Sequence, residues 1–124
     1  MNQKQRTTTP VILEKHYDLL LWLQKQVPQF PRSHRFVLGD RLLGTGMDMQ
    51  GLLVEASYTR DKRALLQQAG IKLAQLRYLV RLAHDLRFFS LRQYGFLSDK
   101  MEEMGRMLGG WIKQQGAVQG EATR

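Results

Sequence analysis

Three histidines and one pair of adjacent glutamates are the side chains of this sequence best suited to metal binding or proton transfer. His16, His34 and His84 lie far apart, and no motif such as HExxH brings two of them onto one helical face. Glu102 and Glu103 would point about 100° apart on a helix, so they cannot act together on one substrate. Their negative charges would instead stabilise the positive N-terminal end of a helix. These residues therefore predict no metal site and no acid-base site.

Other catalytic chemistries lack their residues as well. The chain has no cysteine, which excludes a cysteine nucleophile, a disulfide framework and a thiolate zinc site. Neither GxxxxGK[ST] nor GxGxxG occurs, and the Gly-Thr-Gly at residues 44–46 follows no predicted strand. The sequence predicts a protein that is not an enzyme and that holds no cofactor.

Positive charge is the strongest chemical signal in the chain. It has 19 Lys and Arg against 11 Asp and Glu, a formal charge of +8, which indicates a polyanionic partner such as nucleic acid. Residues 60–92 hold eight of the basic residues against two acidic ones. Arg63, Arg77 and Arg81 fall on one stripe of the helix predicted there. Two interpretations stay open: the stripe binds phosphates without regard to base sequence, or it is a solvated face.

Four amphipathic helices are expected to carry these residues. Thr9 and Pro10 mark the start of the first, because threonine can cap a helix and proline fits its first position. The second begins after Ser33, and its glycines at 44 and 46 leave two outcomes, a continuous helix stabilised by packing or a break. The expected helices cover residues 10–27, 34–56, 61–90 and 98–115.

The third helix has the clearest apolar pattern. Its seam steps by three and four residues through Leu66, Ala69, Leu73, Leu76, Val80 and Ala83. A second apolar line adjoins the seam at Leu79, Leu82, Leu86 and Phe89. The face is therefore predicted to pack against two neighbouring helices. After a turn at residues 93–97, the fourth helix is expected to begin with Ser98 as its cap and to end at Gly116.

Short connections and the lack of any strand pattern predict an all-α fold, an antiparallel up-down-up-down four-helix bundle over residues 10–115. Residues 1–9 and 116–124 are polar and are predicted to be flexible tails. No apolar run approaches the ~18 residues of a membrane span, and no secretory signal opens the chain. We therefore expect no membrane association and a cytoplasmic location.

Three stretches resemble a known family. They are YDLLLW at residues 17–22, FPRSHRFVLG at residues 30–39 and GRMLGGWIK at residues 105–113. Together with the basic third helix, they resemble the accessory variability determinant (Avd) proteins of diversity-generating retroelements. They are also similar to the four-helix-bundle relatives of these proteins that are encoded in ribosomal RNA intervening sequences. The resemblance spans nearly the whole chain.

The resemblance implies a bundle that assembles into a ring-like, pentameric and positively charged barrel. Such a barrel binds the element's reverse transcriptase, its template RNA and the cDNA through backbone contacts, and supports mutagenic, adenine-targeted cDNA synthesis without being an enzyme. Carried over by position, and joined by Arg63 of the charged stripe, the expected binding residues are Arg32, Arg35, Arg63, Arg77, Arg81, Arg106 and Lys113. The alternative is an RNA-associated bundle of a ribosomal intervening sequence with no polymerase partner.

Overall fold

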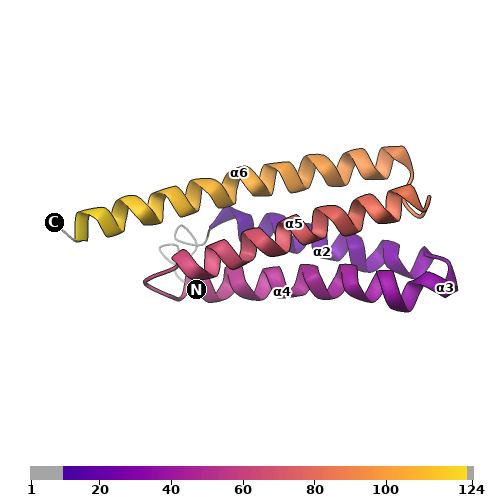
Figure 1. Ribbon diagram of the computed structural model, residues 1–124, viewed down its shortest axis with the longest axis horizontal. Coiled ribbons are helices and arrows are strands. Elements are labelled where there is room, and N and C mark those ends of the chain that lie inside the picture. The colour runs from indigo at the N-terminus through magenta and orange to yellow at the C-terminus, as the bar shows by residue number, and fades with distance from the viewer. Residues whose placement is uncertain (1–9, 123–124) are drawn as a thin grey trace.

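Four long helices lie side by side in the computed structural model, which describes the backbone of residues 10–122 and the side chains of residues 10–116 (Figure 1). The helices are α2 (Val11–Gln26), α4 (Asp40–Ser57), α5 (Arg63–Asp85) and α6 (Leu91–Ala122). No strand occurs in the described residues, and the predicted all-α fold of four helices is confirmed.

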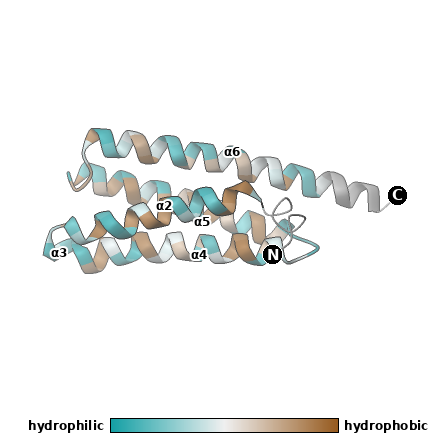
Figure 2. Cartoon of the chain, turned by 180° about the vertical axis from the view of Figure 1, so that it is seen from behind, coloured by the Kyte–Doolittle hydropathy of each residue, from teal (hydrophilic) through white to brown (hydrophobic). Residues whose placement is uncertain are grey.

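Most neighbouring helices of the bundle are also neighbours in sequence, and the first and last helices meet to complete it. Helix α4 packs against α2 and α5, and α6 packs against α5 and α2, which closes the four helices into a ring of contacts. Each helix carries both hydrophobic and hydrophilic residues along its length (Figure 2). The connection between α2 and α4 and the turn between α5 and α6 lie at the same end of the bundle, as an up-down-up-down order requires (Figure 1).

The predicted seam of α5 is the centre of the core. All six of its residues are buried, because a repeat of three and four keeps one face of the helix against its neighbours: Leu66, Ala69, Leu73, Leu76, Val80 and Ala83. The second apolar line is only partly covered. Phe89 is buried, but Leu82 and Leu86 are 47% and 41% exposed. The face of α5 is therefore wider than the surface that α4 and α6 cover.

The segment between α2 and α4 is helical almost throughout. A 3-10 turn, η1 (Val27–Gln29), is followed by α3 (Arg32–His34) and by a π-helix, η2 (Arg35–Gly39), which continues into α4. The second helix therefore begins at Arg32, slightly before the start predicted after Ser33. Of the two outcomes predicted for it, the continuous helix is found, since α4 runs unbroken through Gly44 and Gly46.

One of these glycines lies at a close contact between two helices. A Cβ at Gly46 would lie 2.6 Å from Cδ2 of Leu20 on α2, whereas a Cβ at Gly44 would meet nothing within 4 Å. Gly46 therefore lets α2 and α4 approach closely.

The boundary between the last two helices differs from the prediction. Helix α5 ends at Asp85, and the turn covers residues 86–90, so the helix predicted to reach residue 90 and the turn predicted at residues 93–97 are wrong. Ser90 is the cap: its Oγ accepts a hydrogen bond from the backbone N–H of Gln93 at 3.1 Å, and Gln93 Oε1 accepts one from the N–H of Ser90 at 2.9 Å. This reciprocal pair is a capping box. Ser98 lies inside α6 and caps nothing.

The turn itself satisfies the last carbonyls of α5. The N–H of Arg87 donates to the carbonyl of His84 and the N–H of Phe88 to that of Ala83, each at 2.8 Å. These are the two hydrogen bonds of a Schellman motif. Arg87 takes the left-handed position of the motif, with φ of 68°, where glycine is the usual residue.

The far end of α6 also differs from the prediction. The helix continues to Ala122, so Gly116 does not end it. A glycine in a helix interior costs about 1 kcal/mol relative to alanine, which is too little to force an end by itself. The predicted tail of residues 1–9, and residues 123–124 of the C-terminal one, lie outside the described residues.

Candidate nucleic-acid interface

Each histidine has a structural partner. His16 is fully buried, and its Nε2–H donates to the carbonyl of Gly46 at 2.7 Å across the α2–α4 contact. Burial lowers the pKa of His16 below its ordinary value of 6.5. His84 Nδ1 donates to the carbonyl of Phe89 at 3.1 Å, and its ring stacks on Tyr94. In the described part of the chain, no three His, Asp or Glu side chains come together in a way that could hold a metal ion.

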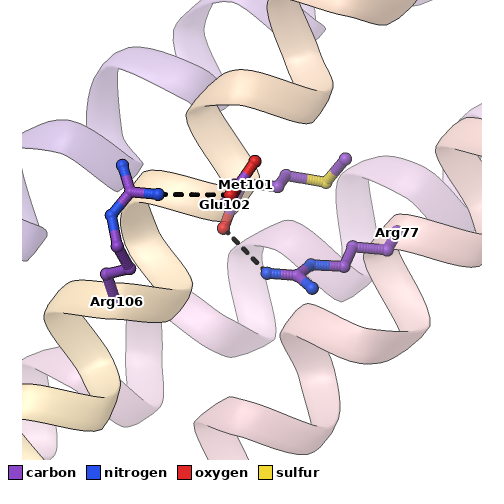
Figure 3. Close-up of polar contacts among 4 residues, drawn as sticks. All are labelled: Arg77, Met101, Glu102 and Arg106. Atoms are coloured by element: carbon purple, nitrogen blue, oxygen red, sulfur yellow. Dashed lines mark hydrogen bonds and ion pairs between the residues drawn. The ribbon is translucent and has the colours of Figure 1, made fainter.

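The basic residues in the middle of the bundle are engaged with α6 or with nearby carboxylates. Arg77 Nη2 donates to the carbonyl of Met101 at 3.1 Å (Figure 3). Arg106 pairs with Glu102 at 3.3 Å. Arg77 and Arg106 therefore approach the same turn of α6 from two sides (Figure 3).

Arg81 completes this middle group. Its Nε lies 3.8 Å from Oδ2 of Asp85, one turn further along α5. Both side chains are well exposed, so the pair is weak, but the carboxylate still offsets the positive charge locally. The stripe on α5 is therefore less positive at its surface than its sequence alone indicates.

Two further predicted binding residues lie at the end of the bundle where α4 leads into α5. Arg63 is exposed at the start of α5, and Lys113 is exposed on α6. The hydrogen bond from Gln115 Nε2 to the carbonyl of Arg60, at 3.4 Å, brings this part of α6 to the α4–α5 connection. Lys62 closes the connection by donating to the carbonyls of Ala56 and Thr59.

The remaining two predicted residues lie at the opposite end. Arg32 is exposed on α3, and Arg35 is partly buried and donates from Nη2 to the carbonyl of Phe30 at 3.4 Å. The Nε of Arg35 is buried without a hydrogen-bond partner in the described residues. The structure thus separates the seven predicted residues into three groups rather than one surface.

An aromatic cluster joins the two chain segments at this end. The Phe30 ring lies 5.3 Å from that of Phe88 and 5.2 Å from that of Phe89, and the His34 ring lies 4.9 Å from Phe88. Trp22 packs beneath, with its ring 5.7 Å from Phe89. These contacts hold the α2–α4 connection against the α5–α6 turn.

The joined segments bring Arg32 and Arg35 together with three cations that the sequence does not predict as binding residues. We call the resulting surface the basic end; its residues are Lys25, Arg32, Arg35, Arg87 and Arg92. Residues 19–39 and 86–98 contain no Asp or Glu. Within the described side chains, no carboxylate forms an ion pair with any residue of the basic end.

An apolar groove between α4 and α5 opens beside the basic end. Its volume is about 830 Å³, and it is lined by Val37, Tyr78, Leu79, Leu82 and Leu86, with Arg41 and Lys72 among its polar residues. Lys72 pairs with Asp48 at 3.7 Å. The uncovered part of the second apolar line of α5 forms one wall of this groove.

One comparison with known proteins identifies a family. A family model described as bAvd-like matches residues 10–115. No curated protein matches the chain. Among the described residues, no helix combines the length and the apolar character needed to cross a bilayer.

Proposed function

Because the chain belongs to the bAvd-like family, we propose that it is a non-enzymatic accessory subunit of a diversity-generating retroelement. The family consists of accessory, non-catalytic proteins that are associated with the retroelement machinery. The chain would bind the element's reverse transcriptase together with its template RNA and cDNA, and so support mutagenic reverse transcription.

The observation that carries nucleic-acid binding is the basic end. Its five cations have no ion-pair partner among the described side chains, and the four exposed ones, Lys25, Arg32, Arg87 and Arg92, are available for phosphates, unlike Arg81 and Arg106. Phosphate contacts of this kind do not read base sequence and weaken as salt rises. Arg63, Arg77 and Lys113 remain proposed contacts that the same assays can test.

The distribution of the remaining polar groups supports a role without catalysis. Two polar side chains in the interior connect α2 with α4: buried His16 donates to the carbonyl of Gly46, and partly buried Gln50 donates to the carbonyl of Leu13. An active site typically places a nucleophile, a base and a stabilising donor around one cavity. The groove between α4 and α5 is instead lined mainly by apolar side chains.

Assembly of several copies is the second part of the proposal. Leu82, Leu86 and the 74% exposed Val37 leave exposed apolar surface in the groove. Apolar surface of this kind favours association, because burying it releases water from the side chains. We propose a closed ring of five copies, in which each subunit would add a formal charge of +8.

Reconstituted cDNA synthesis tests the function. The element's reverse transcriptase would copy its template RNA with the protein, without it, and with the charge-reversed variant Arg32→Glu/Arg92→Glu of the basic end. We expect synthesis to depend on the wild-type protein and to fall with the variant, and we expect no synthesis from the protein alone. Equal synthesis with and without the protein would contradict the proposal. RNA binding without any effect on the polymerase would favour the RNA-associated alternative.

A further inference from the structure

We infer that the basic end is a binding site for single-stranded nucleic acid, in which Lys25, Arg32, Arg87 and Arg92 hold phosphates and Phe36 stacks on a base. The inference rests on the proposed function for nucleic-acid binding. It adds the place of the contact and the form of the nucleic acid.

The first observation is that basic residues in the middle of the bundle form ion pairs, whereas, among the described residues, those of the basic end do not. Along the middle of the bundle, Arg81 and Arg106 each have a carboxylate within 4 Å, at 3.8 and 3.3 Å. At the basic end no such carboxylate is present in the described residues, and the nearest acidic residue before the turn, Asp85, is the partner of Arg81. Binding of a polyanion reduces the mutual repulsion between cations that have no carboxylate nearby.

The second observation is the backbone of Arg87. The Schellman turn places this residue at φ of 68°, in the left-handed region that disfavours side chains other than glycine. Arginine at this position costs conformational energy, and its side chain is exposed at the turn. Strained residues of this kind concentrate at binding sites, where the side chain serves a ligand.

The third observation is exposed apolar surface beside the cations. Phe36 lies one helical turn after Arg32, within the π-helix η2, and is 67% exposed. Leu91, next to Arg92, is 76% exposed. The aromatic cluster of Phe30, Phe88 and His34 supports this end from within.

An exposed aromatic ring among cations favours single strands over duplexes. The faces of bases in a duplex are covered by their neighbours, so a protein ring has nothing to stack on. A single strand offers both its phosphates and its base faces. Backbone contacts and stacking together give binding without base-sequence preference.

Fluorescence anisotropy with the full chain tests the inference. The probes are a labelled, unstructured single-stranded RNA and the duplex that it forms with its complement, titrated between about 50 and 200 mM salt. The basic-end variant is Arg32→Gln/Arg87→Gly/Arg92→Gln, in which glycine at position 87 also fits the backbone. The matched control, Lys15→Gln/Arg60→Gln/Lys72→Gln, removes the same amount of charge at positions that belong neither to the basic end nor to the other proposed contacts.

We expect the wild type to bind the single strand more tightly than the duplex. The basic-end variant should lose at least tenfold in affinity, and its slope of log affinity against log salt should fall by about 2, at roughly 0.7 per lost phosphate contact. The control variant should lose much less. Phe36→Ala should weaken single-strand binding by about fivefold or more and leave duplex binding unchanged, whereas Leu91→Ala should alter neither. Thermal melts of each variant establish that the fold is kept.

Three results would overturn the inference, and they separate it from the proposed function. If the control loses as much affinity as the basic-end variant or more, the site is elsewhere although the protein binds nucleic acid. If Phe36→Ala weakens single strand and duplex equally, or neither, the ring does not stack on a base. If the wild type binds neither probe at low salt, nucleic-acid binding itself fails, and the proposed function fails with it.

Discussion

The guanidinium of Arg77 occupies the space that a side chain at position 105 would need. A Cβ on Gly105 would lie 2.7 Å from Nη2 of Arg77, the atom that donates to the carbonyl of Met101. Because Gly105 on α6 has no side chain, Arg77 on the neighbouring helix α5 can bind the backbone of α6. The relationship makes the two residues energetically coupled.

Gly105→Ala should therefore bring no net stabilisation in the wild type. Alanine gains about 1 kcal/mol over glycine in a helix, but here it displaces Arg77 and removes a hydrogen bond of similar value. In an Arg77→Ala background the same substitution should stabilise by about 1 kcal/mol, because the obstruction is gone. Urea unfolding of the four proteins gives the coupling energy.

Gly109→Ala is the control for this pair. A Cβ at Gly109 would meet nothing within 4 Å, so the substitution should stabilise by about 1 kcal/mol in both backgrounds. Equal gains at positions 105 and 109 in the wild type would show that Arg77 does not depend on Gly105.

Two glycines of α4 should respond in opposite directions to alanine. Gly46→Ala should destabilise by about 1 to 3 kcal/mol, because its methyl group would overlap Leu20 at the α2–α4 contact. Gly44→Ala should stabilise by about 1 kcal/mol, since open space surrounds the position. Midpoints of urea unfolding measure both, and a gain at Gly46 would mean that the helices can separate at little cost.

Burial of His16 should make stability depend on pH. Because its pKa is lowered in the folded chain, the unfolded chain takes up a proton first as the pH falls below about 6.5. The contribution of neutral His16 to the free energy of unfolding is fully present above that pH. It is lost with a slope of up to about 1.4 kcal/mol per pH unit until the pH reaches the folded pKa. Unfolding free energies between about pH 5 and 8 measure it.

His16→Gln provides the control for this measurement. Glutamine can still donate a hydrogen bond towards the carbonyl of Gly46, but it does not titrate. The variant should lose the part of the pH dependence that begins near 6.5. An unchanged pH profile would assign that dependence to other groups.

Arg87→Gly should separate stability from binding. Glycine removes the strain of the left-handed backbone, so the variant should be more stable by about 1 kcal/mol. It should also bind nucleic acid more weakly, because one cation is lost. Arg92→Gly, which removes the same charge near the start of α6, should weaken binding without stabilising the fold. A destabilised Arg87→Gly would show that its side chain supports the turn.

Charge placed in the groove between α4 and α5 should dissociate the assembly. Leu82→Glu/Leu86→Glu would bury two carboxylates in an apolar contact, which is strongly unfavourable. Light scattering should then report a mass near the 14.4 kDa of one chain and a multiple of it for the wild type. Ile71→Glu, exposed on α5 outside the groove, should leave the mass unchanged. A wild type that is monomeric at micromolar concentration would contradict assembly.

The apolar pattern was sufficient to predict the core, because burial on a helix follows its period. The seam from Leu66 to Ala83 is buried at every predicted position. The turn at residues 86–90 was missed because it contains neither glycine nor proline. Its one local signal is the Ser-x-x-Gln of the capping box at Ser90.

The basic end was only half predicted, for a different physical reason. The sequence predicts Arg32 and Arg35 as binding residues but not Lys25, Arg87 and Arg92. The charge pattern along a single helix does not show which connections meet at one end of the bundle. In an up-down-up-down bundle the first and third connections always lie at one end. The absence of acidic residues from both connections was therefore a usable signal. The i,i+4 spacing of Arg81 and Asp85 already indicates that they can pair, whereas the hydrogen bond from Arg77 to the carbonyl of Met101 depends on side-chain geometry between two helices.

Trp22, which packs beneath the basic end, can serve as an intrinsic fluorescent probe of that end. The chain has two tryptophans, and the other, Trp111, lies near Lys62 at the opposite end, with Nζ 6.0 Å from its ring. Each indole therefore senses the polarity and quenching of its own end. With Trp111 replaced by phenylalanine, emission from Trp22 reports on events at the basic end alone, without any attached dye.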